Sequence, residues 1–210
     1  MNGTTKASLP SNVKVLSHPS IASKLDQLRD QSLSGTPVRS LINELSTIIA
    51  IEATREIPPS EKIALIVVLR AGLPMCDPFL DHLPPSTDVA VYHLGLYRER
   101  TTLEPVEYYN KLPAQAPVVK HAYVVDPLIA TGGTAGATVD ILRNWGVEHI
   151  TFLSILASPQ GLAAVANVWP EGVDLVVGHV DETVDEKGYI QPGIGDIGDR
   201  LYGTALAKTG

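Results

Sequence analysis

The 210-residue sequence has a single cysteine, Cys76, so no disulfide bond can form within the chain. Such scarcity is typical of a reducing compartment, and we expect a cytoplasmic location. Cys76 itself is expected to be a small buried residue near the start of a helix rather than a nucleophile. No apolar run is long enough to cross a bilayer, and the first residues lack the apolar core of a signal peptide. We therefore expect no association with a membrane.

Basic residues are also scarce: 16 lysines and arginines stand against 23 aspartates and glutamates, for a net charge of −7. Because nucleic-acid-binding domains are usually basic, we expect no nucleic-acid partner. A small phosphorylated ligand is compatible with this charge, since a few arginines in one place suffice to bind it. The six histidines are scattered without ligand spacing, so we expect no dedicated metal site in the protein.

Two nucleotide-binding motifs are missing as well. No Gly-Lys pair occurs in the chain, which excludes a P-loop. Residues Gly193–Gly198 (GIGDIG) match the letters of the dinucleotide-binding fingerprint, G-x-G-x-x-G. However, no good strand precedes them, and too few residues follow for the helix, second strand and acidic residue that the fingerprint needs. We therefore expect neither nucleotide-binding unit.

The sequence does contain buried-strand patterns that alternate with helical ones. Residues 62–69 (KIALIVVL) form a nearly continuous apolar run, which is typical of a strand buried on both faces. We expect further strands at 88–97, 121–126, 149–157 and 173–180, and helices at 17–30, 36–57, 74–83, 133–146 and 159–170. This alternation predicts an α/β fold, in which helices flank both faces of a parallel sheet after an N-terminal helical segment.

A chain of this length suits one domain, which we expect to span residues 1–210. Three segments are expected to lie outside its core. Residues 1–12 form a loose polar leader, and residues 97–113 form an extended arm that is polar, aromatic and interrupted by proline. Residues 181–204 are rich in turn-forming residues and form a small C-terminal hood.

Three charged residues stand at the ends of successive expected strands: Arg70, Arg98 and Asp126. Ligands of parallel α/β sheets bind beyond the carboxyl ends of the strands, so these residues predict a site at that edge. The loop Leu128–Thr134 then leads into a helix, with two glycines, two threonine hydroxyls and a run of main-chain amides. Such a loop can bind phosphate; the alternative is a tight turn in which Thr134 caps the helix.

Four segments carry a resemblance that extends from about residue 18 to residue 204. They are LRAGLPM (69–75), LYRERTTLEPVEYYNKLP (96–113), VVDPLIATGGTA (124–135) and YIQPGIGDIGDRLYGT (189–204). In this order they resemble uracil phosphoribosyltransferases, a branch of the type I phosphoribosyltransferase family. The wider family has two adjacent acids at the start of the phosphate loop. In the uracil branch the usual form is an Asp-Pro pair, as in Asp126–Pro127.

The resemblance implies transfer of a phosphoribosyl group from phosphoribosyl pyrophosphate (PRPP) to N1 of uracil, giving UMP and pyrophosphate in pyrimidine salvage. It implies catalytic roles for Arg98, Asp126 and Asp196, and a Mg²⁺ cofactor bound through the pyrophosphate. The implied PRPP-binding residues are Arg70, Ala71, Gly72, Arg98, Asp126, Pro127, Leu128, Ile129, Ala130, Thr131, Gly132, Gly133, Thr134 and Asp196. The implied uracil-binding residues are Tyr189, Ile190, Gly195, Asp196 and Ile197. At the turn Arg70–Gly72 we expect an unusual backbone, such as a non-proline cis peptide.

Several points stay open at the level of the sequence. A homodimer or higher homo-oligomer is expected, and the arm is a lid, a dimer contact through Tyr108 and Tyr109, or both. An allosteric nucleotide is compatible with the resemblance. The proton from uracil N1 could pass to pyrophosphate, to water or to Asp196. The alternative functions are a phosphoribosyltransferase for another base and a non-catalytic regulator that binds PRPP or UMP.

Overall fold

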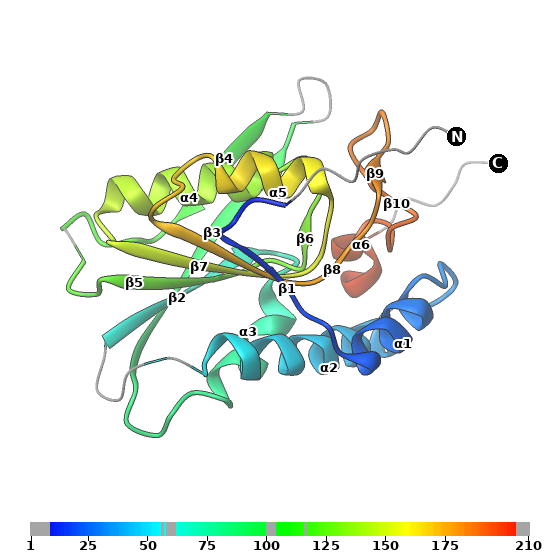
Figure 1. Ribbon diagram of the computed structural model, residues 1–210, viewed down its shortest axis with the longest axis horizontal. Coiled ribbons are helices and arrows are strands. Elements are labelled where there is room, and N and C mark those ends of the chain that lie inside the picture. Colours follow the sequence, from blue (N-terminus) through cyan, green and yellow to red (C-terminus); the bar gives the residue numbers. More distant parts are fainter. Residues whose placement is uncertain (1–8, 56, 58–61, 100–103, 116, 205–210) are drawn as a thin grey trace.

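The protein folds around a mostly parallel sheet (Figure 1). The structure, a computed structural model, describes residues 9–55, 57, 62–99, 104–115 and 117–204. The strand order is β1-β8-β7-β5-β2-β3-β4, with β6 beside β7, and all pairs are parallel except β3 with β4. The strands are β1 (Val13–Val15), β2 (Lys62–Leu69), β3 (Asp88–Arg98), β4 (Pro105–Asn110), β5 (His121–Val125), β6 (Leu128–Ile129), β7 (His149–Ala157) and β8 (Val173–Val180).

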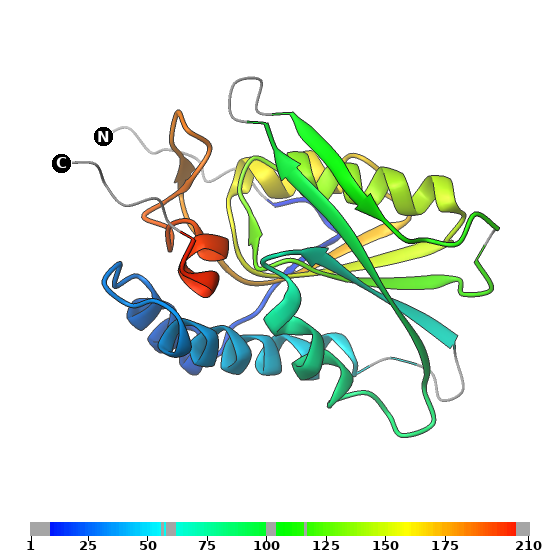
Figure 2. The same ribbon diagram turned by 180° about the vertical axis from the view of Figure 1, so that it is seen from behind.

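Helices cover both faces of the sheet, which confirms the predicted fold class (Figures 1 and 2). One face carries α1 (Pro19–Leu28), α2 (Thr36–Ala53) and α3 (Leu73–Leu80), and the other carries α4 (Gly133–Trp145) and α5 (Pro159–Ala166). Alternate residues of β2 serve the two faces: Ile63 belongs to the cluster with α1–α3, and Ala64 to the cluster with α4 and α5. The apolar run of β2 is continuous because both of its faces are buried.

The predicted arm contains β4, which pairs antiparallel with the end of β3. Residues 100–103, between these two strands, lie outside the described residues. The predicted hood contains a small antiparallel sheet of β9 (Thr183–Val184) and β10 (Ile190–Gln191), followed by α6 (Ile197–Tyr202). We did not predict α6, because it has only six residues and includes a glycine, Gly198. It begins where the side chain of Asp196 accepts a hydrogen bond from the main-chain N–H of Asp199 at 3.0 Å.

The expectation of a loose leader at residues 1–12 is wrong for its last part. Residues 1–8 lie outside the described residues. Asn12, however, donates from its side chain to the carbonyl oxygen of Val173 at 2.8 Å and accepts from the main-chain N–H of Leu175 at 2.8 Å. It thereby fixes β1 against β8 at the edge of the sheet. Among the described residues, no helix has both the length and the apolar character needed to span a membrane.

Candidate active site

A cleft of about 330 Å³ opens at the carboxyl ends of β2, β5 and β6. The parallel topology places the three sequence-predicted segments around it: the turn after β2, the loop after β5 and the C-terminal hood. The predicted residues that line the cleft are Arg70, Ala71, Asp126, Leu128, Ile129, Ala130, Thr131, Gly132, Gly133, Thr134, Tyr189, Ile190, Gly195, Asp196 and Ile197. Segments more than 100 residues apart in the sequence therefore share one concave surface.

Asp126 lies at the floor of this cleft, directly after β5. Only 7% of its surface is exposed. Burial disfavours the charged carboxylate and raises its pKa to about 7, although a hydrogen bond from the main chain of Leu128 acts in the opposite direction. The carboxyl group therefore titrates near neutral pH, and it is available to a ligand that donates hydrogen bonds to it.

The loop after Asp126 is held in shape by close packing against α5. The hydroxyl of Ser158 donates to the carbonyl oxygen of Ala130 at 2.6 Å. A Cβ added at Gly161 would lie 2.3 Å from that same oxygen, so the two backbones approach as closely as a glycine allows. Gly132 has a φ of +85°, in the left-handed region that glycine tolerates, and it forms the N-cap of α4. The loop thus delivers its main-chain amides to the N-terminus of a 13-residue helix, where an anion is favoured.

The turn after β2 has the unusual backbone that the resemblance implied. The peptide bond between Leu69 and Arg70 is cis, although the second residue is not proline. Gly72 then passes so close to β5 that an added Cβ would lie 2.4 Å from the carbonyl oxygen of Val125. This approach explains why Gly72 is buried and why Ala71 rather than Gly72 faces the cleft. Pro127 is likewise buried outside the cleft lining, where it ends β5.

Arg70 connects this turn to the hood. Its guanidinium lies 3.5 Å from a carboxylate oxygen of Asp199 and 5.6 Å from the ring centroid of Tyr202. The hydroxyl of Tyr202 donates to the main-chain carbonyl of Arg70 at 3.0 Å. About half of the Arg70 side chain is exposed, and its contacts with Asp199, Thr204 and Tyr202 hold the guanidinium beside the hood. Arg98 ends β3 opposite Pro105, but its side chain is outside what the structure describes.

The hood contributes main chain more than side chains. Gly195 has a φ of +74°, and an added Cβ would lie 2.6 Å from the side-chain oxygen of Gln31. Ile190 and Ile197 are buried, whereas Tyr189 and Asp196 are exposed at the cleft. The predicted uracil-binding residues are therefore gathered in one place, and their individual roles stay predictions.

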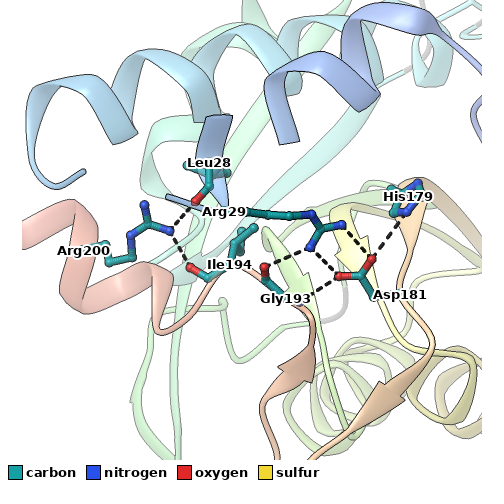
Figure 3. A network of polar contacts seen from close by, with 7 residues as sticks. All are labelled: Leu28, Arg29, His179, Asp181, Gly193, Ile194 and Arg200. Atoms are coloured by element: carbon teal, nitrogen blue, oxygen red, sulfur yellow. Dashed lines mark hydrogen bonds and ion pairs between the residues drawn. The ribbon is translucent and has the colours of Figure 1, made fainter. Parts of the chain in front are cut away.

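Sequence reasoning missed some residues of this region. Tyr97, Tyr108 and Ile194 also line the cleft. Of these, Tyr108 was singled out only as an arm residue. A second group consists of Arg29 at the end of α1 and of Asp181 and Arg200 within the hood, and it binds the main chain of the hood away from the cleft lining (Figure 3). No short-range pattern could have revealed it, because Arg29 and Asp181 are 152 positions apart in the sequence.

Comparison with known proteins settles the family. The profile described as uracil phosphoribosyltransferase matches residues 56–204, which is more than half of the chain. The chain belongs to the uracil phosphoribosyltransferase family. Its resemblance to that family therefore extends from the four motifs to most of the sequence.

Relatives named for this activity match almost from end to end. A uracil phosphoribosyltransferase of Roseiflexus castenholzii is 41% identical over 209 residues, covering 91% of this chain and 98% of that protein. One of Lachnoclostridium phytofermentans is 40% identical, covering 92% of this chain and 99% of its own. A Schizosaccharomyces pombe protein that carries this name provisionally is 45% identical over 193 residues, covering 92% of this chain and 91% of that protein.

The fold is shared with a solved structure, that of the AQ2163 protein from Aquifex aeolicus. It superposes with a TM-score of 0.83 at 32% identity, over 93% of this chain and 100% of that one.

Proposed function

We propose that this protein transfers the phosphoribosyl group of PRPP to N1 of uracil, forming UMP and pyrophosphate. The observation that carries the proposal is the cleft described above, which in a chain from this family gathers a buried acid, a phosphate-type loop and a glycine-rich hood. Each of these three parts suits a different part of the two substrates.

The loop and Asp126 suit the ribose 5-phosphate half of PRPP. The main-chain amides of residues 130–134, at the N-terminus of α4, offer donors to the three phosphate oxygens. Asp126 lies on the same floor, where its carboxylate would accept hydrogen bonds from the ribose hydroxyls. The turn at Arg70 and Ala71 lies along the same cleft, and it would bind the pyrophosphate through main-chain amides and the guanidinium.

The hood suits the base. Uracil presents alternating carbonyl acceptors and an N–H donor along one edge, and main-chain groups of Gly195–Ile197 can match that alternation. Because the glycine has no side chain, the backbone can approach a flat ring closely. Cytosine carries an amino group where uracil has a carbonyl, so a site fixed by main-chain groups would leave a polar group unpaired and reject it.

The reaction breaks the bond between C1 of the ribose and the pyrophosphate oxygen, and it forms the bond between C1 and uracil N1. Positive charge grows on the ribose and negative charge on the leaving pyrophosphate, so catalysis is mainly positioning and electrostatics. Arg70 and Arg98 would stabilise the leaving group, and an ionised Asp126 would hold the ribose. The proton from N1 leaves with pyrophosphate, through water or to Asp196.

Magnesium would bind through the substrate. In the described part of the chain, no group of three or more His, Cys, Asp or Glu side chains is arranged to hold a metal ion. The cleft does contain two carboxyl groups, Asp126 and Asp196, and these fit a hydrated Mg²⁺ that is held mainly by pyrophosphate oxygens. When bound, Mg²⁺ would neutralise part of the negative charge on the pyrophosphate.

A base-selectivity assay tests the proposal. The purified protein is incubated with PRPP, Mg²⁺ and one of uracil, cytosine, hypoxanthine or orotate, and the nucleotide product is separated and identified. We expect UMP and pyrophosphate with uracil, and turnover at least about a hundredfold lower with the other bases. Turnover with a different base instead of uracil would show that the substrate is another base. Absence of any product from pH 6 to pH 9 would contradict the proposed activity and favour the alternative of a non-catalytic regulator.

The remaining expectations on assembly and setting are proposals of the same kind. The arm exposes about half of the surface of Tyr97 and Tyr108, which suits a contact with a second subunit or a lid over the cleft. A homo-oligomer, an allosteric nucleotide and a cytoplasmic location stay predictions.

A further inference from the structure

The loop that carries Gly195 into the cleft is rich in glycine, which favours conformational freedom. Three glycines, Gly193, Gly195 and Gly198, fall within six residues, and the first two have φ values of +59° and +74°. Glycine loses more conformational freedom on ordering than any other residue, so a ligand that had to order this loop would bind more weakly. Something else in the molecule must hold the loop in its binding conformation.

Two charged side chains hold both polar groups of the same glycine (Figure 3). The main-chain N–H of Gly193 donates to the carboxylate of Asp181 at 2.9 Å, and its carbonyl oxygen accepts from the guanidinium of Arg29 at 2.9 Å. Arg29 and Asp181 also bind one another through two parallel hydrogen bonds of 2.8 Å each. The arginine at the end of α1 and the aspartate after β8 therefore form one rigid frame around Gly193.

The electrostatics keep this frame charged. Burial by itself would raise the pKa of Asp181, but the hydrogen bonds from Arg29 and Gly193 and the charge of Arg29 outweigh it and lower the pKa. The hydrogen bond to Asp181 raises the pKa of Arg29. Only 4% of the Asp181 side chain is exposed, so water competes little for these bonds.

A third side chain holds the next residue. Arg200, in α6, donates to the carbonyl oxygens of Ile194 and Leu28 at 2.6 Å each. Within the described residues, the main chain of Gly193 and Ile194 forms its hydrogen bonds with three side chains: it donates to Asp181 and accepts from Arg29 and Arg200. Gly195, which lines the cleft, follows immediately.

We propose that Arg29 and Asp181 are positioning residues for base recognition, which preset the Gly193–Gly195 loop before uracil binds. The inference rests on the proposed function, since it assigns the loop to the base. Neither side chain lies in the lining of the cleft described above, so both act through the main chain of Gly193.

Two conservative variants test the proposal. Arg29→Lys keeps the charge but loses the fork that binds Asp181 and Gly193 together, and Asp181→Asn replaces one acceptor oxygen by a donor. For both, we expect the KM for uracil to rise about tenfold, while the KM for PRPP stays within about twofold of the unmodified protein. We also expect discrimination between uracil and cytosine to fall, because a loosened loop no longer enforces the pattern of main-chain groups.

The matched control is Arg55→Lys. Arg55 lies just beyond the C-terminal end of α2 and forms an ion pair with Glu52, whereas Gly35, just before the start of α2, bonds to Arg200 of the hood. The 18 residues of α2 span about 27 Å, so Arg55 lies at the opposite end of this helix from the hood. This variant should leave both KM values unchanged. If Arg29→Lys and Asp181→Asn lower only the melting temperature and leave the KM for uracil unchanged, the proposal is overturned. Absence of UMP formation by the unmodified protein would overturn the proposed function and this inference with it.

A measurement on the unmodified protein covers the case in which both variants fail to fold. In the ligand-free protein, the amide of Gly193 should exchange its hydrogen at least about a hundredfold more slowly than in an unstructured peptide, because it is already bound to Asp181. Exchange at the unprotected rate, with protection only after uracil and PRPP are added, would show that the ligand orders the loop and would overturn the proposal.

Discussion

At the scale of single residues, Asp126 combines a structural cost with a proposed catalytic role. Its burial raises the pKa to about 7, so an ionised Asp126 is held in an environment that disfavours its charge. A ligand that donates hydrogen bonds and carries Mg²⁺ relieves this cost. Such a conflict is typical of residues kept for function rather than for stability.

The stability of the protein should reveal this conflict. Because the folded-state pKa is raised above the ordinary 3.8, the contribution of Asp126 favours folding below about pH 4 and is lost as the pH rises through 7. Asp126→Asn removes the titrating group, so its melting temperature should exceed that of the wild type by an amount that grows from pH 5 to pH 7 and then levels off. A shift of about three pKa units at roughly 1.4 kcal/mol each sets an upper limit near 4 kcal/mol. A difference that is the same at every pH would contradict this account.

The same variant should separate the two substrates. Asp126→Asn loses a charged acceptor for the ribose hydroxyls, so PRPP binding should weaken by about tenfold or more, with little change for uracil. In the wild type, the KM for PRPP should rise as the pH falls below 7, because protonation neutralises the carboxylate, and in Asp126→Asn this dependence should disappear. Initial rates at several pH values provide the measurement. A larger effect on uracil than on PRPP would mean that the site is oriented the other way.

Residues of the site were predictable where a local pattern carries the chemistry. Asp126 and the loop after it stand out because an acid, a proline, two glycines and two threonines follow a strand. Arg29 and Asp181 do not stand out. Arg29 is an ordinary arginine at the end of a helix, and nothing near it in the sequence indicates a partner 152 positions away. Their roles arise only from the packing of α1 beside the hood.

At the scale of elements, the phosphate-type loop depends on α5. Gly161, near the start of α5, touches the backbone of Ala130, and Ser158 binds the same carbonyl group. The loop is thus held in place by α5, although no residue of α5 lines the cleft.

Gly161→Ala should therefore damage PRPP binding. The new Cβ would lie 2.3 Å from the carbonyl oxygen of Ala130, so the loop or α5 must shift. We expect a loss of stability of about 1–3 kcal/mol and a KM for PRPP that rises about tenfold. Gly136→Ala, in α4, is the control, because its Cβ would meet only Val168 at 3.4 Å. Equal KM values for the two variants would show that α5 does not position the loop.

The elements themselves were predicted best where they are long and apolar. The strands at 149–157 and 173–180 were predicted at their observed bounds, because most of their positions are buried and apolar, although Asp174 in the second strand is exposed. The short elements β1, β6, β9, β10 and α6 were missed. With two to six residues each, they have no periodicity to detect and are held by tertiary contacts.

At the scale of the whole molecule, the arm places exposed aromatic side chains beside the cleft, while Leu112 near its end packs against the core. Tyr108 lines the cleft, and Tyr109 exposes 40% of its surface next to it. Adjacent aromatics on an extended arm can serve the active site and a subunit interface at once.

Two matched variants distinguish these uses. Tyr109→Ser should lower the mass of the assembly in sedimentation velocity if the arm forms an interface, and Tyr108→Ser should raise the KM values about three- to tenfold if the arm closes over the cleft. An unchanged mass in both variants would remove the arm from the interface, and unchanged kinetics in both would remove it from the active site.

The central claim is that the cleft at the carboxyl ends of β2, β5 and β6 is where phosphoribosyl transfer to uracil takes place. A crystal structure of the protein with UMP tests it most directly. The account predicts the 5′-phosphate on the main-chain amides of residues 130–134, the ribose hydroxyls on Asp126 and the base against Gly195–Ile197. A nucleotide bound elsewhere, or bound here with its base at the loop and its phosphate at the hood, would contradict it.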